Sequence, residues 1–286
     1  MRWQDLRPSS NVEFGGGGGG RGLALGGGGL GLVAIAVIAM LFGVDPRVVL
    51  QGAPQQQASA VDPNRVAETP EEKFAVSILG STDDVWGPIF QADGGTYQPP
   101  TLHMFSGQTT TQCGQGVAAM GPFYCPLDRK VYLDLSFFQE LSQRFGAGGD
   151  FAQAYVIGHE VGHHVQTLTG TSEDVRRQQA RVSKTQGNQL SVRLELQADC
   201  YAGVWANRAN QANIASNGRP LLEPGDVEEG LAAANAIGDD TLQRQSQGRV
   251  VPDAFTHGSS EQRVRWFRRG LDAGEPGVCD SFSGRV

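Results

Sequence analysis

The spacing of apolar residues separates a short, strand-rich region from a helical C-terminal half. From residue 137 onward, apolar side chains recur every three or four positions, which is the period of a helix with one buried face. The clearest stretches run from Phe151 to Thr167 and from Leu190 to Asn210. Between Tyr97 and Asp134 the apolar runs are short and are bounded by Gly, Pro and Thr clusters, which favours strands and turns. The pattern predicts an α+β domain that is mostly helical, with a small antiparallel sheet.

Capping motifs predict where three further helices begin. Thr69 is followed by Pro70 and Glu72, a combination that satisfies the first N–H groups of a helix and marks the expected start of the folded domain. The same type of motif recurs at residues 226–229 and at residues 259–262. We therefore expect helices to start at these three places.

The N-terminal part of the chain has a different pattern. Residues 23–44 carry no charge and are about long enough to cross a bilayer as one helix. Three arginines precede this segment against two acidic residues, an excess that places the N-terminus inside and the rest of the chain outside the cell membrane. The predicted organisation is a cytoplasmic tail (1–22), a single transmembrane anchor (23–44), a flexible linker (45–69) and one folded domain (70–286).

A cleaved signal peptide is the alternative interpretation of the same segment. Leu30 to Val44 would then be its hydrophobic region, and Ala58-Ser59-Ala60 is the nearest place with small residues at the spacing of a cleavage site. Either interpretation exports the folded domain.

Export determines whether the four cysteines can form disulfides. Four cysteines allow three pairings. Outside the cytoplasm disulfides form and persist, and the expected pairs are Cys113–Cys125 and Cys200–Cys279. In a cytosolic protein the same residues would be reduced, buried thiols.

Composition and charge narrow the class of protein. A length of 286 residues and a hydrophobic fraction of 39% suit one sizeable soluble domain with appendages. The formal charge of -7 argues against binding nucleic acid, which needs a basic surface. A basic cluster near the C-terminus is interleaved with Trp266 and Phe267, so we interpret it as the solvated face of an amphipathic helix. Its members are Arg263, Arg265, Arg268 and Arg269.

The segment His159-Glu160-Val161-Gly162-His163 carries the candidate chemistry. Histidines four positions apart project from the same face of a helix and can bind one metal ion together. Glu160 follows the first histidine, so its carboxylate can accept a proton from a zinc-bound water without binding the metal. This division of labour is that of zinc hydrolases with the His-Glu-x-x-His motif.

A catalytic zinc needs a third protein ligand, and the extended motif does not supply it. Gln166 and Thr169 stand where that motif requires Gly and His. Glu195 is the next candidate, on the helix expected over 190–210. Asp199 lies one turn later and is placed to accept a hydrogen bond from a ligand histidine.

The pairing of HEVGHH with the downstream ELQAD resembles the gluzincin metallopeptidases, in which His, His and Glu bind zinc. More closely, the chain resembles the bacterial neutral zinc metallopeptidase family over nearly its whole length. The departure is at Phe14-Gly15 and the glycine run that follows, where the family tends to have charged residues. The resemblance implies a zincin-like catalytic domain with one Zn²⁺ per chain. The blocks that carry it are MRWQDLRPSSNVE, GPFYCPLDRKVYLDLSFF, IGHEVGHHVQ, ELQADCYAGVWA and THGSSEQRVRWFRRG.

Two further roles are expected around such a site. Gluzincins align the substrate backbone against an edge strand before the metal helix, and residues 131–134 are similarly placed. His257 is the preferred donor to the oxyanion of the transition state, because it precedes a helix N-terminus, with Tyr201 and Tyr155 as competitors. His164 points off the ligand face and is expected to pack, and His103 has no assigned role.

These features predict a membrane-anchored zinc metalloendopeptidase that hydrolyses peptide bonds with a zinc-bound water activated by Glu160. Its expected partners are a protein or peptide substrate and the membrane, without nucleic acid. One alternative is a membrane-tethered binding protein with a structural zinc, which would have no use for Glu160. The other is a zinc hydrolase that acts on a non-peptide amide.

Overall fold

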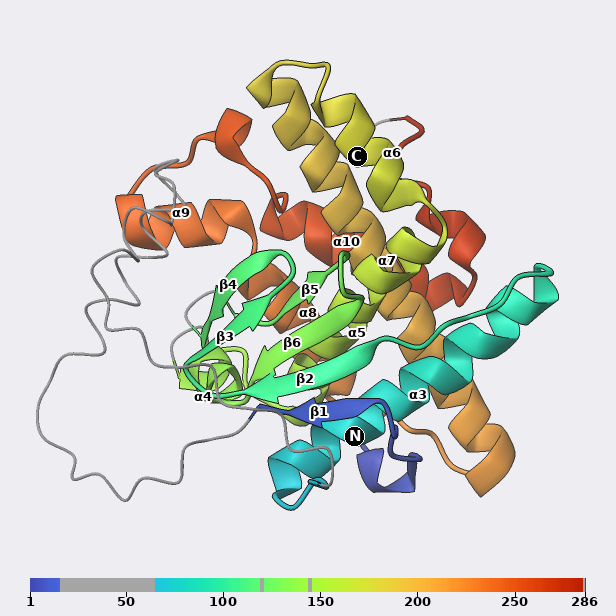
Figure 1. The fold of residues 1–286 in the computed structure, drawn as a ribbon. Helices are drawn as coiled ribbons and strands as arrows, with labels where there is room; N and C mark the ends of the chain where they lie inside the picture. Colours follow the sequence, from blue (N-terminus) through green and yellow to red (C-terminus); the bar gives the residue numbers. More distant parts are fainter. Residues whose placement is uncertain (16–64, 119–120, 144–145, 285) are drawn as a thin grey trace, which may run out of the picture.

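The computed structural model describes residues 1–15, 65–118, 121–143, 146–284 and 286, and it has the α+β architecture that the sequence predicts (Figure 1). The helices are α3 (Pro70–Ala92), α4 (Ser136–Gln143), α5 (Asp150–Leu168), α6 (Thr171–Gln179), α7 (Lys184–Asn217), α8 (Asp226–Ala236), α9 (Asp239–Gln247) and α10 (Ser260–Ala273). The strands are β1 (Val12–Phe14), β2 (Thr101–Phe105), β3 (Gln108–Thr111), β4 (Gly114–Val117), β5 (Phe123–Cys125) and β6 (Lys130–Asp134). Short 3-10 turns are η1 (Trp3–Asp5), η3 (Pro252–Ala254) and η4 (Pro276–Cys279).

The main sheet is mixed, so the prediction of a small antiparallel sheet is wrong in this respect. Its order is β1-β2-β6-β5, in which β1 and β6 both run parallel to β2 and only β5 is antiparallel to its neighbour. Strands β3 and β4 form a separate antiparallel hairpin. The parallel pairs arise because β2 takes its partners from distant parts of the chain: Leu102 lies opposite Val12 on one side and Val131 on the other.

Residues 1–15 belong to the folded domain, unlike the separate cytoplasmic tail that the charge pattern predicts. Besides supplying β1, this segment crosses α3 at Gly80, where an added β-carbon would lie 2.0 Å from the backbone oxygen of Arg7. The amide of Ser9 donates to the backbone oxygen of Val76 at 2.9 Å. The first fifteen residues and the C-terminal domain therefore share one core and one sheet.

This arrangement constrains how the chain can meet a membrane. The predicted anchor at 23–44 lies outside the described residues, and in the part of the chain that is described no helix is both long and apolar enough to cross a membrane. A single crossing between residues 15 and 65 would put β1 and β2 on opposite sides. The predicted topology would therefore require β1 to leave this sheet.

Glycines let the central helices approach one another closely. Gly158 and Gly162 of α5 both face α7, where added β-carbons would lie 2.8 Å from the Trp205 ring and 2.9 Å from the oxygen of Ala198. The crossing of α7 and α10 is tighter still, because a β-carbon on Gly270 would lie 1.9 Å from the oxygen of Cys200. These helices are packed behind the main sheet in Figure 1, with α5 next to the strands.

The helix starts follow the predicted capping motifs in two of three cases. Thr69 and Ser259 each form a complete capping box, and the first of these precedes a proline, as expected. Helix α8 instead begins after Gly225, which has a left-handed backbone and no capping side chain, so the predicted box at 226–229 is wrong. Helix α7 is also longer than predicted, from Lys184 to Asn217.

Both expected disulfides are present. Cys113 in the β3–β4 turn is bonded to Cys125 at the end of β5. Cys200 of α7 is bonded to Cys279, and this bond ties the C-terminal segment to the helix that carries Glu195 and Asp199.

The tight helix crossing gives a stability prediction. Gly270→Ala should lower the free energy of unfolding by about 3 kcal/mol, because the new methyl group has no space against the α7 backbone. Gly187→Ala is the matched control, since its only close neighbour is the Gln179 side chain at 3.9 Å, and it should gain about 0.5–1 kcal/mol from helix propensity. Urea denaturation measures both, and equal effects of the two changes would refute the close contact.

Candidate metal centre

Helix α5 carries the two histidines of the motif on one face. The ring centroids of His159 and His163 lie 4.7 Å apart and their planes are nearly perpendicular, at 86°. The backbone is held there because α5 is buried along most of its length and meets α7 through Gly158 and Gly162. The histidine faces are thus set against the neighbouring helix.

Glu195 of α7 completes the cluster. Its carboxylate oxygens lie 3.2 Å from Nε2 of His159 and 3.4 Å from Nε2 of His163. The three candidate ligand atoms all lie within 4.8 Å of one another. Two imidazoles and one carboxylate are the donor set of several catalytic zinc sites, in which the fourth position is open to water or substrate. The residues present therefore fit a zinc ion.

Each histidine is oriented by an acceptor on its other ring nitrogen. Nδ1 of His159 lies 2.8 Å from Asp199, as the sequence predicts. Nδ1 of His163 lies 2.9 Å from the side-chain oxygen of Gln166, whose amide donates in turn to the backbone oxygen of Leu194 at 2.6 Å. Such contacts fix the ring tautomer and leave Nε2 free for a metal. Gln166 entered the sequence argument only as a departure from the extended motif.

Arg263 is buried, so the prediction that it lies on a solvated face is wrong. It is not part of a solvated basic face, because its side chain is only 3% exposed. Its Nε and Nη2 donate to the two oxygens of Asp199 at 2.9 and 2.8 Å, a bidentate pair, while Nη1 reaches the backbone oxygen of Ile237 at 3.3 Å. Burial raises the pKa of Asp199, but Arg263 and His159 outweigh it and hold the pKa of that carboxyl low. The exposed members of the cluster are Arg265, Arg268 and Arg269.

Glu160 lies beside the cluster with a free carboxylate. It is buried, and within the described residues it makes no hydrogen bond. Burial raises the pKa of this carboxyl, while the nearby His159 and His163 act in the opposite direction. A buried carboxylate without a protein partner is available to a water molecule at the cluster.

His257 stands on a loop that Asp239 organises. One oxygen of Asp239 accepts the amides of Thr256, His257 and Gly258 at 2.7 to 3.0 Å, and the other lies 3.2 Å from Nδ1 of His257. The loop rests on α7 beside Glu195, since a β-carbon on Gly258 would touch the side chains flanking that residue, Val192 and Leu196. Asp239 was not anticipated from the sequence.

Tyr155 and Tyr201, the alternative candidates for the oxyanion donor, make other contacts. Tyr155 donates to Asp199 at 2.5 Å and is fully buried. Tyr201 packs edge-on against Trp86, and burial raises its pKa to about 12. The side chain of His257, by contrast, is 52% exposed.

The edge strand next to the zinc-site helix is β5, so the expectation for residues 131–134 is wrong. Those residues form β6, which has β2 on one side and β5 on the other. Strand β5 contacts α5 through His164. This histidine is buried, as expected, and its Nδ1 lies 3.0 Å from the hydroxyl of Tyr124. His103 is likewise structural, with contacts to Glu13 and Thr109.

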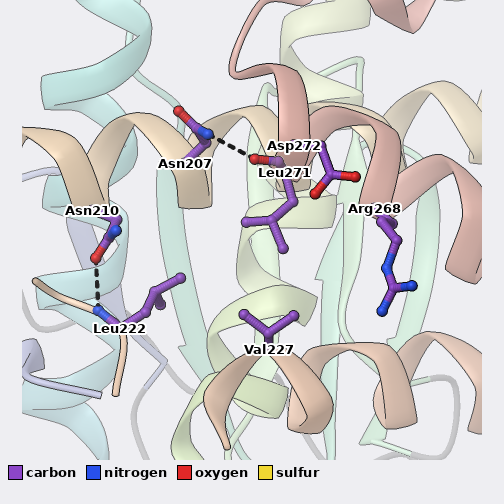
Figure 2. A pocket seen from close by; sticks show the side chains of 7 residues that line it. All are labelled: Asn207, Asn210, Leu222, Val227, Arg268, Leu271 and Asp272. Carbon is purple, nitrogen blue, oxygen red and sulfur yellow. Dashed lines mark hydrogen bonds between the residues drawn. The ribbon is translucent and has the colours of Figure 1, made fainter. Parts of the chain in front are cut away.

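Two other features lie away from the cluster. A second group of carboxylates comprises Asp150, Asp226 and Glu229, and the α-amino group of Met1 lies 2.8 Å from Asp150 and 3.3 Å from Asp226. A cavity of about 470 Å³ lies between α7, α8 and α10. Figure 2 shows the residues that line it, among which Asn207 donates to the backbone oxygen of Leu271. Its seven lining residues include none of the candidate ligands.

The cluster has the donor set found in zinc peptidases that use two histidines and one glutamate. The chain belongs to the family described as "Putative neutral zinc metallopeptidase", whose model matches residues 1–282. It is 50% identical to the uncharacterized protein YpfJ of Escherichia coli over 293 residues, which covers 99% of each chain. It is also 43% identical to the uncharacterized protein Rv2575 of Mycobacterium tuberculosis over 262 residues, 86% of this chain and 85% of that protein. No solved structure was found to match it.

Arg263 gives a prediction that does not depend on catalysis. Arg263→Leu should weaken zinc binding about 10- to 100-fold, because Asp199 loses the partner that aims it at His159. Leaving that buried carboxylate without its cationic partner should also cost about 3–5 kcal/mol of stability. Chelator competition and urea denaturation measure the two effects.

Two further variants show whether the effects of Arg263→Leu come from loss of this contact or from misfolding. Arg263→Lys keeps the charge but cannot form the bidentate pair, so its zinc affinity should fall between those of wild type and Arg263→Leu. Arg265→Leu removes an exposed arginine from the same helix and should leave both quantities unchanged. Wild-type zinc affinity in Arg263→Leu would refute the role of this residue.

Proposed function

We propose that this protein is a zinc-dependent metallopeptidase that hydrolyses peptide bonds. The observation that carries the proposal is the placement of Glu160, a buried carboxylate without a hydrogen-bond partner in the described residues, next to the cluster of His159, His163 and Glu195. Family membership supports the same conclusion.

The chain's own residues divide the work in this proposal. His159, His163 and Glu195 would hold the zinc ion, with Asp199 and Gln166 fixing the histidine rings. When bound, zinc supplies Lewis-acid activation of a water molecule and of the scissile carbonyl. Glu160 accepts the proton of the attacking water and passes it to the leaving amine.

His257 is proposed to stabilise the oxyanion that develops at the carbonyl. Asp239 holds Nδ1 of its ring, which leaves Nε2 as the donor, and the half-exposed side chain can reach a substrate. Burial lowers the pKa of His257, but Asp239 and Glu195 outweigh it and raise the pKa overall, so the ring holds its proton more readily than a free histidine.

Strand β5 is proposed as the place where an extended substrate binds. It is the sheet edge beside α5, and no strand of the described chain pairs with its outer side. Backbone groups on such an edge can pair with a peptide as an added strand. This use of the edge favours a peptide over a small amide that lacks a repeating backbone.

The activity proposal is tested by Glu160→Gln. This change should leave stoichiometric zinc but lower kcat for a peptide by about 10²–10⁴-fold, because the amide cannot accept the water's proton. Bound metal is measured by mass spectrometry and cleavage with a mixed peptide library. Wild-type protein with full zinc and no cleavage of any library peptide would favour the zinc-containing binding protein instead.

Controls in the same assay separate the remaining assignments. Glu195→Ala should lose zinc, whereas His257→Gln should keep zinc and lose part of kcat, about 10- to 100-fold. Cleavage of small amides by a wild-type enzyme that spares peptides would favour the non-peptide hydrolase.

We also propose that the folded domain, residues 1–15 included, works outside the cytoplasm. The two disulfides support an oxidising compartment. Attachment to the membrane through residues 23–44 belongs to the same proposal, on the lack of charge of that segment, which would enter the membrane and return on the same side because β1 and β2 pair in one sheet.

The location is tested with exposed cysteines at Ser10→Cys and Gln245→Cys. In cells with an intact cytoplasmic membrane, a membrane-impermeant maleimide should label both, because the two positions belong to one fold. Labelling of Gln245→Cys alone would mean that β1 leaves the sheet, and labelling of neither would place the domain inside.

A further inference from the structure

Strand β5 is too short to be held by its backbone alone. It has three residues, Phe123–Cys125, and among the described strands it pairs with β6 alone. A short edge strand gains few ladder hydrogen bonds and frays unless its side chains are anchored. Since the proposed function uses this strand to align the substrate, whatever anchors it also controls substrate binding, and the inference below rests on that function.

On the side of the helices, β5 is anchored next to the candidate metal ligands. The hydroxyl of Tyr124 lies 3.0 Å from Nδ1 of His164, the residue after His163. The other ring nitrogen of His164 lies 2.6 Å from the backbone oxygen of Gln98, to which it donates.

On its opposite side, β5 is anchored by the β3–β4 hairpin. Phe123 stacks on Tyr132 of β6, with centroids 4.9 Å apart, and Gly116 of the hairpin fits against the Phe123 ring so closely that a β-carbon would lie 2.6 Å from it. The covalent part of this anchor is the bond between Cys113 in the hairpin turn and Cys125.

The two disulfides differ in how easily a thiol can reach them. Cys200 and Cys279 are both fully buried, as is Cys125, whereas Cys113 is exposed. Thiol–disulfide exchange requires a thiolate to approach one sulfur in line with the bond, so access decides which disulfide reacts. Of the two disulfides, only Cys113–Cys125 has an exposed residue at one end.

We infer that the Cys113–Cys125 disulfide is a redox-sensitive tether that keeps β5 in place for an extended substrate. A dithiol reductant attacks Sγ of Cys113, the S–S bond breaks, and Cys125 leaves as a thiolate that takes up a proton. The second thiol of the reductant then displaces Cys113, so that two electrons and two protons reach the protein and the reductant becomes a disulfide. The hairpin is then no longer cross-linked to β5 by a disulfide. The Cys200–Cys279 bond remains and still holds the C-terminal segment against α7.

The physical part of the inference is tested on the full-length zinc-loaded protein. Partial reduction with dithiothreitol, followed by alkylation and mass spectrometry, should label Cys113 and Cys125 before Cys200 and Cys279. Hydrogen exchange of the Phe123–Cys125 amides should then accelerate at least about tenfold, with α5 unchanged. Equal reduction of the two bonds, or unchanged exchange in β5, would overturn the tether.

The functional part is tested with Cys113→Ser/Cys125→Ala, and with Gln115→Ser as a hairpin control that keeps the disulfide. The double variant should retain stoichiometric zinc and show a KM about tenfold higher for a long peptide, with kcat/KM for a minimal dipeptide amide unchanged. The control should match wild type. An unchanged KM, or loss of zinc from the double variant, would overturn the inference.

These outcomes can be told apart from a failure of the proposed function. If wild-type protein cleaves no peptide, the peptidase assignment fails, whereas the order of reduction and the exchange of β5 still decide whether the tether exists. Zinc content, measured in every sample, shows whether an effect originates at the metal cluster or at the strand.

Discussion

The carboxylate of Asp199 is the group on which the rest of the site depends. It is fully buried, and it accepts from Tyr155, from His159 and twice from Arg263. A charge in that position is tolerated because both carboxylate oxygens accept hydrogen bonds and the guanidinium balances it. The same contacts join α5, α7 and α10, so the orientation of one candidate metal ligand and the packing of three helices have a common origin.

Such contacts need helices that approach more closely than ordinary side chains allow. Gly162 on α5 and Gly270 on α10 each press against the backbone of α7, on either side of Asp199 and Cys200. Glycine lowers helix propensity by roughly 1 kcal/mol per position, and the burial of the surrounding core offsets this cost. These glycines make the isolated helices less stable but allow their axes to lie closer together. The short distance between the axes allows Arg263 of α10 to reach Asp199 of α7.

Strand β5 is held in place differently from the helices that carry the candidate metal ligands. Behind the histidines the structure is a continuous helical core, whereas the edge strand β5 is three residues long and is fixed by individual contacts, a hydroxyl–imidazole hydrogen bond and a disulfide. A metal site requires rigid ligands, while an edge that accepts peptides must remain open on one side. Under the proposed function, in which β5 aligns a peptide, these two requirements account for the difference between the packed helices and the tethered strand.

The sequence by itself determined most features that depend on local spacing. A helix places His159 and His163 on one face whatever surrounds it, and Thr69 and Ser259 cap their own helices. The cysteine pairs and the spacing of Glu195 and Asp199 on one helix were also predicted from the sequence. Tertiary structure decided what spacing cannot encode. Arg263 looked like one of four surface arginines, and only the crossing of α10 with α7 buries it against Asp199. Similarly, β1 was assigned to a tail and residues 131–134 to an edge, because strand order is set by contacts between distant segments, which no local pattern records.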